Sequence, residues 1–117
     1  MYSDNIRHLR RPTTPNAVFR RRWRANWVAQ LQTARGALPC IVEDISAAGA
    51  KLCIGPALID GGSASLIIID FDPIDAHVAW RRGHRLGLHF TERQPRVRDL
   101  VMRAARANSW TPGNGAF

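Results

Sequence analysis

The chain has 117 residues, of which 45% are hydrophobic, so it can form one domain with a modest core but not a large enzyme fold. Its 17 basic residues outnumber the 9 acidic ones and give a net charge of +8, which favours an anionic partner. Every basic residue except Lys51 is arginine, the side chain that binds phosphate and guanine edges through a planar fork of donors. A coding bias toward arginine is the alternative explanation of this excess.

No segment predicts a signal peptide or a membrane span, because the longest strongly apolar run, at 66–69, is far too short. We therefore expect a cytoplasmic protein that does not insert into membranes. The two cysteines, Cys40 and Cys53, form no CxxC pair and have no histidine at zinc-ligand spacing. We expect two reduced thiols, no metal site and no cofactor.

The first 19 residues carry three arginines, two prolines and few apolar side chains. This composition is typical of a flexible arm that cannot bury itself. A basic run at 20–24 follows, and strand-like patterns begin at Trp27. We predict a flexible basic arm at 1–19, a folded domain at 20–108 and a loose tail at 109–117.

Strand patterns fill the middle of the chain. Polar and apolar residues alternate at 27–33, and two further strands are predicted at 38–45 and 50–54. An unbroken apolar run within 65–70 predicts a fourth strand that is buried on both faces.

The last two strands are predicted to form a hairpin with its turn around Gly83. Trp80 on the first strand and Phe90 on the second are expected to point inward. His77 and His89 fall on the outward side and are expected to lie directly opposite each other. We interpret them as surface residues, because no third metal ligand lies near them in the sequence.

Six short strands with one apolar face each predict an all-β domain, with a closed six-stranded antiparallel barrel over 27–90. Apolar residues at helical spacing in 94–108 predict one amphipathic C-terminal helix that caps or flanks this barrel. Pro95 suits the first turn of that helix.

Two short motifs together could bind a guanine nucleotide. Arg20 and Arg24 form an RxxxR motif, and residues four apart on an extended segment lie on the same side, about 13 Å apart. Asp44, Ser46 and Gly49 form a DxSxxG motif. A carboxylate accepts hydrogen bonds from guanine N–H groups, a hydroxyl donates or accepts, and glycine lets the backbone approach a flat ring. Each motif alone is weak, since a strand followed by a polar turn also produces DxSxxG.

With these motifs in this order, and with a Val-Ala-Trp hairpin that closes in Gly-Leu-His-Phe, residues 20–91 resemble the PilZ family of bacterial cyclic di-GMP receptors. The resemblance implies that cyclic di-GMP binds on the barrel surface. It places Arg20 and Arg24 on phosphate and guanine, and the DxSxxG residues around a guanine. Further candidates for the site come from the same basic run, with solvent exposure or packing as the alternatives: Arg21, Arg22 and Trp23.

The resemblance also implies a receptor or adaptor module of second-messenger signalling and not an enzyme, and no catalytic constellation stands out in the sequence. We expect the arginine arm to order over the ligand and to change a surface that an unidentified effector protein recognises. The alternative is a protein that binds single-stranded nucleic acid, as other small basic barrels do. Nucleic acid is the less favoured partner, because the strand aromatics mostly point inward.

Overall fold

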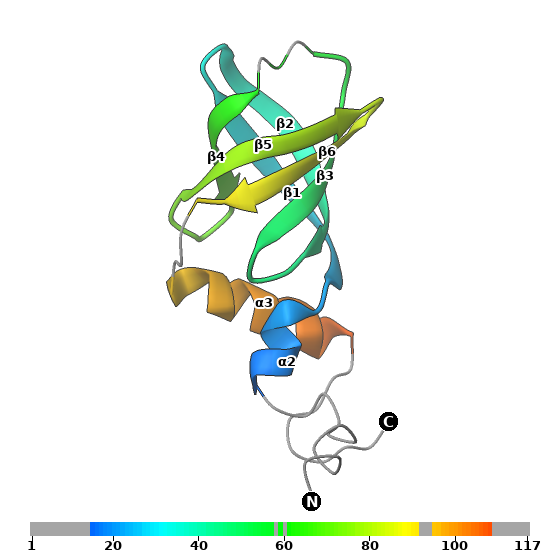
Figure 1. The fold of residues 1–117 in the computed structure, drawn as a ribbon, viewed down its shortest axis with the longest axis vertical. Coiled ribbons are helices and arrows are strands. Elements are labelled where there is room, and N and C mark those ends of the chain that lie inside the picture. Colours follow the sequence, from blue (N-terminus) through cyan, green and yellow to red (C-terminus); the bar gives the residue numbers. More distant parts are fainter. Residues whose placement is uncertain (1–14, 58, 60, 92–94, 109–117) are drawn as a thin grey trace, which may run out of the picture.

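The structure is a computed structural model, and it describes residues 15–57, 59, 61–91 and 95–108. This part of the chain forms six strands and two helices (Figure 1). In chain order they are α2 (Pro15–Arg20), β1 (Trp23–Thr33), β2 (Gly36–Ile45), β3 (Gly49–Ile54), β4 (Gly62–Ile68), β5 (Ile74–Arg82), β6 (Arg85–Phe90) and α3 (Pro95–Ala107).

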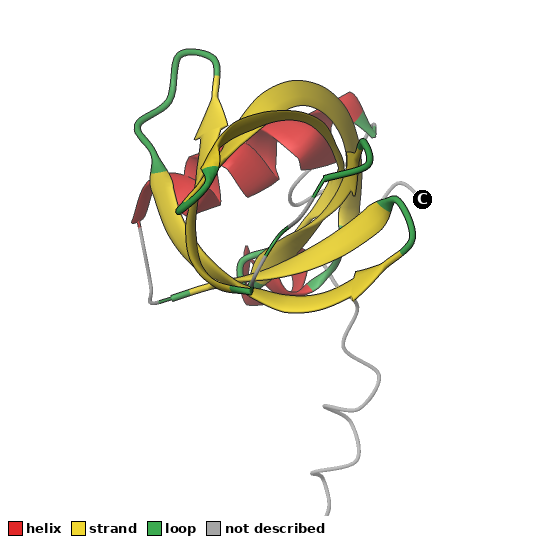
Figure 2. Cartoon of the chain, turned by 90° about the horizontal axis from the view of Figure 1, so that it is seen from above, coloured by secondary structure: helices red, strands yellow, loops and turns green. Residues whose placement is uncertain are grey.

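The strands close into a barrel in the order β1, β2, β3, β6, β5 and β4, and each neighbouring pair whose register is defined is antiparallel. Figure 2 looks into the barrel and shows the strands encircling its interior. The predicted antiparallel barrel with a C-terminal helix is therefore confirmed. Closure pairs every strand on both sides, so no strand edge is left exposed. Among the described residues, no helix is long and apolar enough to cross a membrane.

Alternate residues of the strands fill the barrel with aliphatic side chains. Leu31 of β1, Leu52 of β3 and Leu66 of β4 are fully buried, and burying such a side chain stabilises the fold by about 1.5–3 kcal/mol. Helix α3 crosses one end of the barrel (Figure 1) and closes it with its apolar face. That face consists of Val97, Leu100, Val101, Ala104 and Ala105.

The predicted flexible arm is wrong for its last residues, 15–19. They belong to α2, where Val18 and Phe19 are buried in the core. The guanidinium of Arg98 on α3 lies 4.0 Å from the centroid of the Phe19 ring. Two apolar residues are too few to produce a helical pattern, so only packing against α3 reveals this helix. Residues 1–14 of the arm and the tail at 109–117 lie outside the described residues.

Strand β1 begins at Trp23, four residues before the predicted start. Its register against β2 shifts between Arg24 and Trp27, which marks a β-bulge. Asn26 lies in this bulge with a φ of 56°, in the left-handed region that asparagine tolerates better than most residues.

A second irregularity turns Trp80 outward. The β5 to β6 register shifts between Val78 and Trp80, so Trp80 pairs with Gly87. The Trp80 side chain is 41% exposed, and the prediction that it belongs to the core is wrong. A single extra residue in a strand reverses the face of every residue beyond it, and strict alternation cannot reveal such a change.

Candidate ligand-binding site

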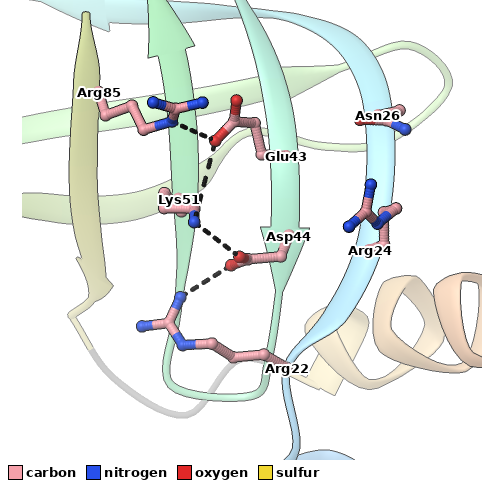
Figure 3. A pocket seen from close by; sticks show the side chains of 7 residues that line it. All are labelled: Arg22, Arg24, Asn26, Glu43, Asp44, Lys51 and Arg85. Carbon is pink, nitrogen blue, oxygen red and sulfur yellow. Dashed lines mark hydrogen bonds and ion pairs between the residues drawn. The ribbon is translucent and has the colours of Figure 1, made fainter.

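A charged pocket of about 460 Å³ lies on the outer face of the barrel. Its side chains come from β2, β3, β6 and the first residues of β1, together with Arg22 just before β1 (Figure 3). Four are cationic and two are anionic, so the lining has a net charge of +2. The lining residues are Arg22, Arg24, Asn26, Glu43, Asp44, Lys51 and Arg85.

A bulge in β2 brings the two carboxylates of the pocket to the same face. Val42 and Ile45 are both fully buried, and the register between β2 and β3 shifts between Val42 and Asp44. Glu43 and Asp44 therefore both project outward, although neighbours on a regular strand point to opposite faces. Lys51 of β3 faces both of them.

The charged side chains form a chain of alternating sign across the pocket (Figure 3). Arg85 Nε donates to Glu43 Oε1 at 3.0 Å. Lys51 Nζ lies 4.0 Å from Glu43 Oε1 and 3.6 Å from Asp44 Oδ2. Arg22 Nη1 donates to Asp44 Oδ1 at 2.7 Å. This chain holds cationic donors and carboxylate acceptors side by side on one surface.

The cationic neighbours keep Glu43 ionised. The hydrogen bond from Arg85 is the largest cause that lowers the pKa of the Glu43 carboxyl, and the positive charges of Arg85, Lys51 and Arg24 lower it further. The same contact raises the pKa of Arg85. The pocket therefore presents anionic acceptors at neutral pH.

The arginine run contributes Arg22 and Arg24 to the pocket, whereas Arg20 and Arg21 do not line it. Arg20 ends α2 and is exposed. Arg21 stacks over the Trp23 ring at 4.4 Å from its centroid. The RxxxR spacing selects Arg20 and Arg24, but α2 ends at Arg20, and Arg22 takes the place at the pocket that the motif assigned to Arg20.

Trp23 is 5% exposed and belongs to the core. Its Nε1 donates to the carbonyl oxygen of Val18 at 2.8 Å, and the N–H of Ala47 donates to the carbonyl oxygen of Phe19 at 2.8 Å. These two contacts fix the end of α2 against β1 and against the turn between β2 and β3. Trp23 thus holds the arginine run against the core. This agrees with the alternative that the sequence left open, in which Trp23 packs in the fold.

Ser46 and Gly49 shape the turn that follows Asp44. The N–H of Ser46 donates to the carbonyl oxygen of Gly49 at 2.9 Å, and the N–H of Ala48 donates to Ser46 Oγ at 3.3 Å. Ser46 is 7% exposed. A Cβ at Gly49 would collide with the carbonyl oxygen of Leu88 on β6, so close packing of β3 on β6 already requires glycine here.

Three residues that line the pocket were not predicted from the sequence: Glu43, Lys51 and Arg85. Unbroken alternation from Cys40 and Val42 makes Glu43 outward and Asp44 inward, so without the bulge the two carboxylates do not share a face. Lys51 and Arg85 lie 34 positions apart in the sequence and meet only because β3 pairs with β6, where Lys51 faces Gly87 and Cys53 faces Arg85. Lys51 being the single lysine of the chain was the one signal that could have drawn attention to it.

The predicted histidine pair is confirmed in the β5 to β6 hairpin. His77 faces His89 with ring centroids 5.7 Å apart. Within the part of the chain that the structure describes, no group of three or more potential ligands could hold a metal ion. A second pocket of about 440 Å³ lies over β4 and β5, and Asp75 is the charged residue in its otherwise uncharged lining.

Comparison with known proteins identifies the domain. The model of the PilZ domain family matches residues 18–106, which include the arginine run, the whole barrel and nearly all of α3. The chain belongs to the PilZ domain family. PilZ domains are a family of cyclic di-GMP receptors that act as binding and adaptor modules. The predicted family is therefore confirmed.

Two solved structures share the PilZ fold with this chain. The crystal structure of the PilZ domain of CeSA from a cellulose-synthesizing bacterium has 18% identity and a TM-score of 0.57, with 77% of this chain and 99% of that chain covered. The structure of the Bacillus subtilis inhibitor of motility, MotI/DgrA, has 20% identity and a TM-score of 0.52, with 77% and 51% covered. This chain therefore spans about half of the inhibitor. None of the curated proteins compared with the chain matched it.

Proposed function

We propose that this PilZ domain is a cytoplasmic bacterial receptor that binds cyclic di-GMP in the charged pocket. The observation that carries the proposal is the meeting of the arginine run at 20–24 with the DxSxxG motif: Arg22 and Arg24 line the same pocket as Asp44, and Arg22 binds Asp44 directly. The ligand has two phosphodiester groups and therefore two negative charges. The net charge of +2 on the pocket lining balances them.

The donors and acceptors of the pocket suit both parts of this ligand. Arg22 and Arg24 can donate to a phosphate or to guanine O6 and N7. Asp44 can accept from the N–H groups on the Watson–Crick edge of guanine, which an adenine lacks in that arrangement. Lys51 beside Asp44 keeps this carboxylate paired while Arg22 moves onto the ligand.

We assign the remaining motif residues supporting roles. Ser46 and Gly49 hold the turn next to Asp44 and let β3 pack closely on β6. Trp23 anchors the arginine run. Arg20 and Arg21 flank the pocket-lining residues in the sequence and would reach a phosphate after a change in the connection between α2 and β1.

Signalling would follow from a change in the surface around α2, without catalysis. The end of α2 is bonded both to Trp23 and to the turn after Asp44, so a ligand that pulls Arg22 away from Asp44 acts on both contacts. We propose that the arginine run, which Trp23 and Arg22 hold in place without ligand, shifts onto cyclic di-GMP and that the arm at 1–14 orders over the ligand. An effector protein would then recognise the altered surface.

Calorimetric titration with cyclic di-GMP tests this proposal. We expect saturable binding by the wild type and a loss of affinity of about tenfold to a hundredfold for Arg24→Ala and for Asp44→Ala, because each removes a charge-assisted hydrogen bond. Arg106→Ala and Asp99→Ala are the matched controls, since both residues are exposed on α3 and lie outside the pocket. Unchanged affinity in both pocket variants would contradict the site.

A parallel titration with a short single-stranded DNA addresses the alternative function. Binding by phosphate contacts alone weakens steeply as salt is added. Tight, salt-sensitive binding of the DNA together with no response to cyclic di-GMP would refute the proposal and favour a nucleic-acid-binding barrel.

A further inference from the structure

The side of the pocket away from Arg24 carries two more cations. Lys51 on β3 and Arg85 on β6 lie on the far side of Glu43 and Asp44 from Arg24 (Figure 3). Neither residue belongs to the RxxxR or the DxSxxG motif. Arg24 on β1 and Arg85 on β6 are separated by three strand spacings of about 4.8 Å, or about 14 Å along the sheet, and Lys51 on β3 is two spacings from β1. The guanidinium of Arg22 reaches across Asp44 to the β3 side (Figure 3).

Arg85 is held in an orientation that leaves its outer end available. Glu43 accepts from Nε, and the two terminal nitrogens of the guanidinium make no hydrogen bond or ion pair to the residues that the structure describes. The Arg85 side chain is 59% exposed. An arginine fixed through Nε with its terminal NH₂ groups free is prepared to donate to an anion.

Lys51 reinforces this position. Its ammonium lies between the two carboxylates, at 4.0 Å from Glu43 and 3.6 Å from Asp44, and its side chain is only 35% exposed. Lys51 is thus shared by Glu43 and Asp44, so the chain of Arg22, Asp44, Lys51, Glu43 and Arg85 holds three cations and two carboxylates and keeps one net positive charge for an anion.

We infer that Lys51 and Arg85 form a second anion-binding position in the pocket, which takes one phosphodiester of the dinucleotide while Arg24, on the opposite side, takes the other. Glu43 is the positioning residue that orients Arg85. This inference rests on the proposed function, because it assigns the second phosphate of the same ligand. With two separate anion-binding positions, the pocket would select a ligand that has two separated phosphates.

The test compares cyclic di-GMP with GMP on the Arg85→Ala variant. GMP has a single phosphate that carries close to two negative charges near neutral pH, so it matches the total charge of cyclic di-GMP but not its two positions. We expect Arg85→Ala to weaken cyclic di-GMP binding about tenfold or more and GMP binding by less than threefold. Calorimetry measures the affinity for cyclic di-GMP, and an NMR titration measures the weaker affinity for GMP.

Arg82→Ala is the matched control, because Arg82 is exposed and lies opposite Arg85 in the β5 to β6 pair but outside the pocket. We expect it to change the affinity for cyclic di-GMP less than twofold. Arg85→Gln is a second variant that keeps a donor and removes the charge, and it should behave like Arg85→Ala. Thermal unfolding midpoints close to that of the wild type would show that the variants are folded.

The possible results separate the two proposals. If the wild type binds cyclic di-GMP and Arg85→Ala matches Arg82→Ala, the second anion position is overturned and the proposed function stands. An equal loss of affinity for cyclic di-GMP and for GMP would also overturn it. Such a result would mean that Arg85 attracts any anion through its positive charge and does not contact a second phosphate. A wild type that does not bind cyclic di-GMP overturns both.

Discussion

Glu43 and Asp44 give the pocket its chemical character. Two carboxylates on adjacent residues would repel each other if left alone, yet each is paired with two cations. Exposed ion pairs of this kind contribute little to the stability of the fold. Their main effect is on the positions of the charged side chains. They hold donors and acceptors in alternation, as recognition of a guanine nucleotide requires.

At the scale of single residues, Glu43 offers a pH test of this arrangement. Because Arg85 lowers its pKa below the ordinary value of 4.5, the carboxylate should stay ionised as the pH falls through 4.5. A lowered pKa in the folded state contributes stability above the ordinary value and loses it as the pH falls through the lowered value. In Arg85→Ala the largest cause is removed, so the Glu43 pKa should rise toward 4.5.

An NMR titration of the side-chain carboxyl carbon measures this pKa directly. The Arg82→Ala variant serves as the control and should keep the wild-type value. A Glu43 carboxyl that titrates at or above 4.5 in the wild type would show that the Arg85 contact does not persist in solution.

The residues that sequence analysis could and could not predict differ in a physical way. Asp44 and Arg24 were predicted because a motif carries them, and both line the pocket. Whether these residues bind ligand stays a prediction. The motif spacing selected Arg20 over Arg22, whereas Arg22 lines the pocket and Arg20 does not, because α2 ends at Arg20. That Glu43 and Asp44 share a face depends on the bulge in β2, and the approach of Arg85 depends on the pairing of β3 with β6; neither leaves a local pattern.

At the scale of elements, the barrel and the C-terminal helix were predictable because apolar periodicity survives along most of each strand and along α3. The exceptions lie at bulges. Register shifts in β1, β2 and β5 change which side chains face outward, and the shift in β2 is what exposes both carboxylates. Alternation therefore predicts the strands and the core, but it does not predict the outward-facing residues at the bulges, some of which form the pocket.

The close contact between β3 and β6 leads to a stability prediction. In Gly49→Ala the new Cβ would meet the carbonyl oxygen of Leu88, a backbone atom that cannot rotate away, so we expect a loss of about 1–3 kcal/mol in the free energy of unfolding. Urea unfolding followed by circular dichroism measures it.

Gly55→Ala is the control for that measurement, because a Cβ at Gly55 would have no atom within 4 Å. It should leave stability unchanged or raise it slightly, since alanine has less backbone freedom to lose on folding. Equal stability of the two variants would mean that β3 and β6 are not as tightly packed as the structure has them.

At the scale of the whole molecule, the excess of arginine has several uses. Arg98 and Arg103 stack on Phe19 and Phe71, and Arg96 donates to the carbonyl oxygen of Pro73. These arginines tie the helices and loops to the barrel. The net charge of +8 therefore attracts anions in general, and the proposed function assigns selectivity to the pocket residues.

The helical layer is also bonded to the strand that carries Arg24. The side-chain amide of Asn108, just after α3, donates to the carbonyl oxygen of Arg24 at 3.0 Å and to that of Ala104 at 2.7 Å. The pocket thus contacts both helices through short bonds, α3 through Arg24 and α2 through the turn after Asp44. If the pocket binds cyclic di-GMP as proposed, these bonds connect the ligand to both helices.

The most direct test of the central claim is a titration of isotope-labelled protein with cyclic di-GMP, followed by amide chemical shifts. We predict that the largest shifts fall on 22–26 and 43–51, with smaller ones at the end of α3. Amides lining the second pocket, such as those of Gln32 and Ser63, should remain nearly unchanged. Shifts centred on that second pocket, or none at saturating ligand concentrations, would contradict the claim.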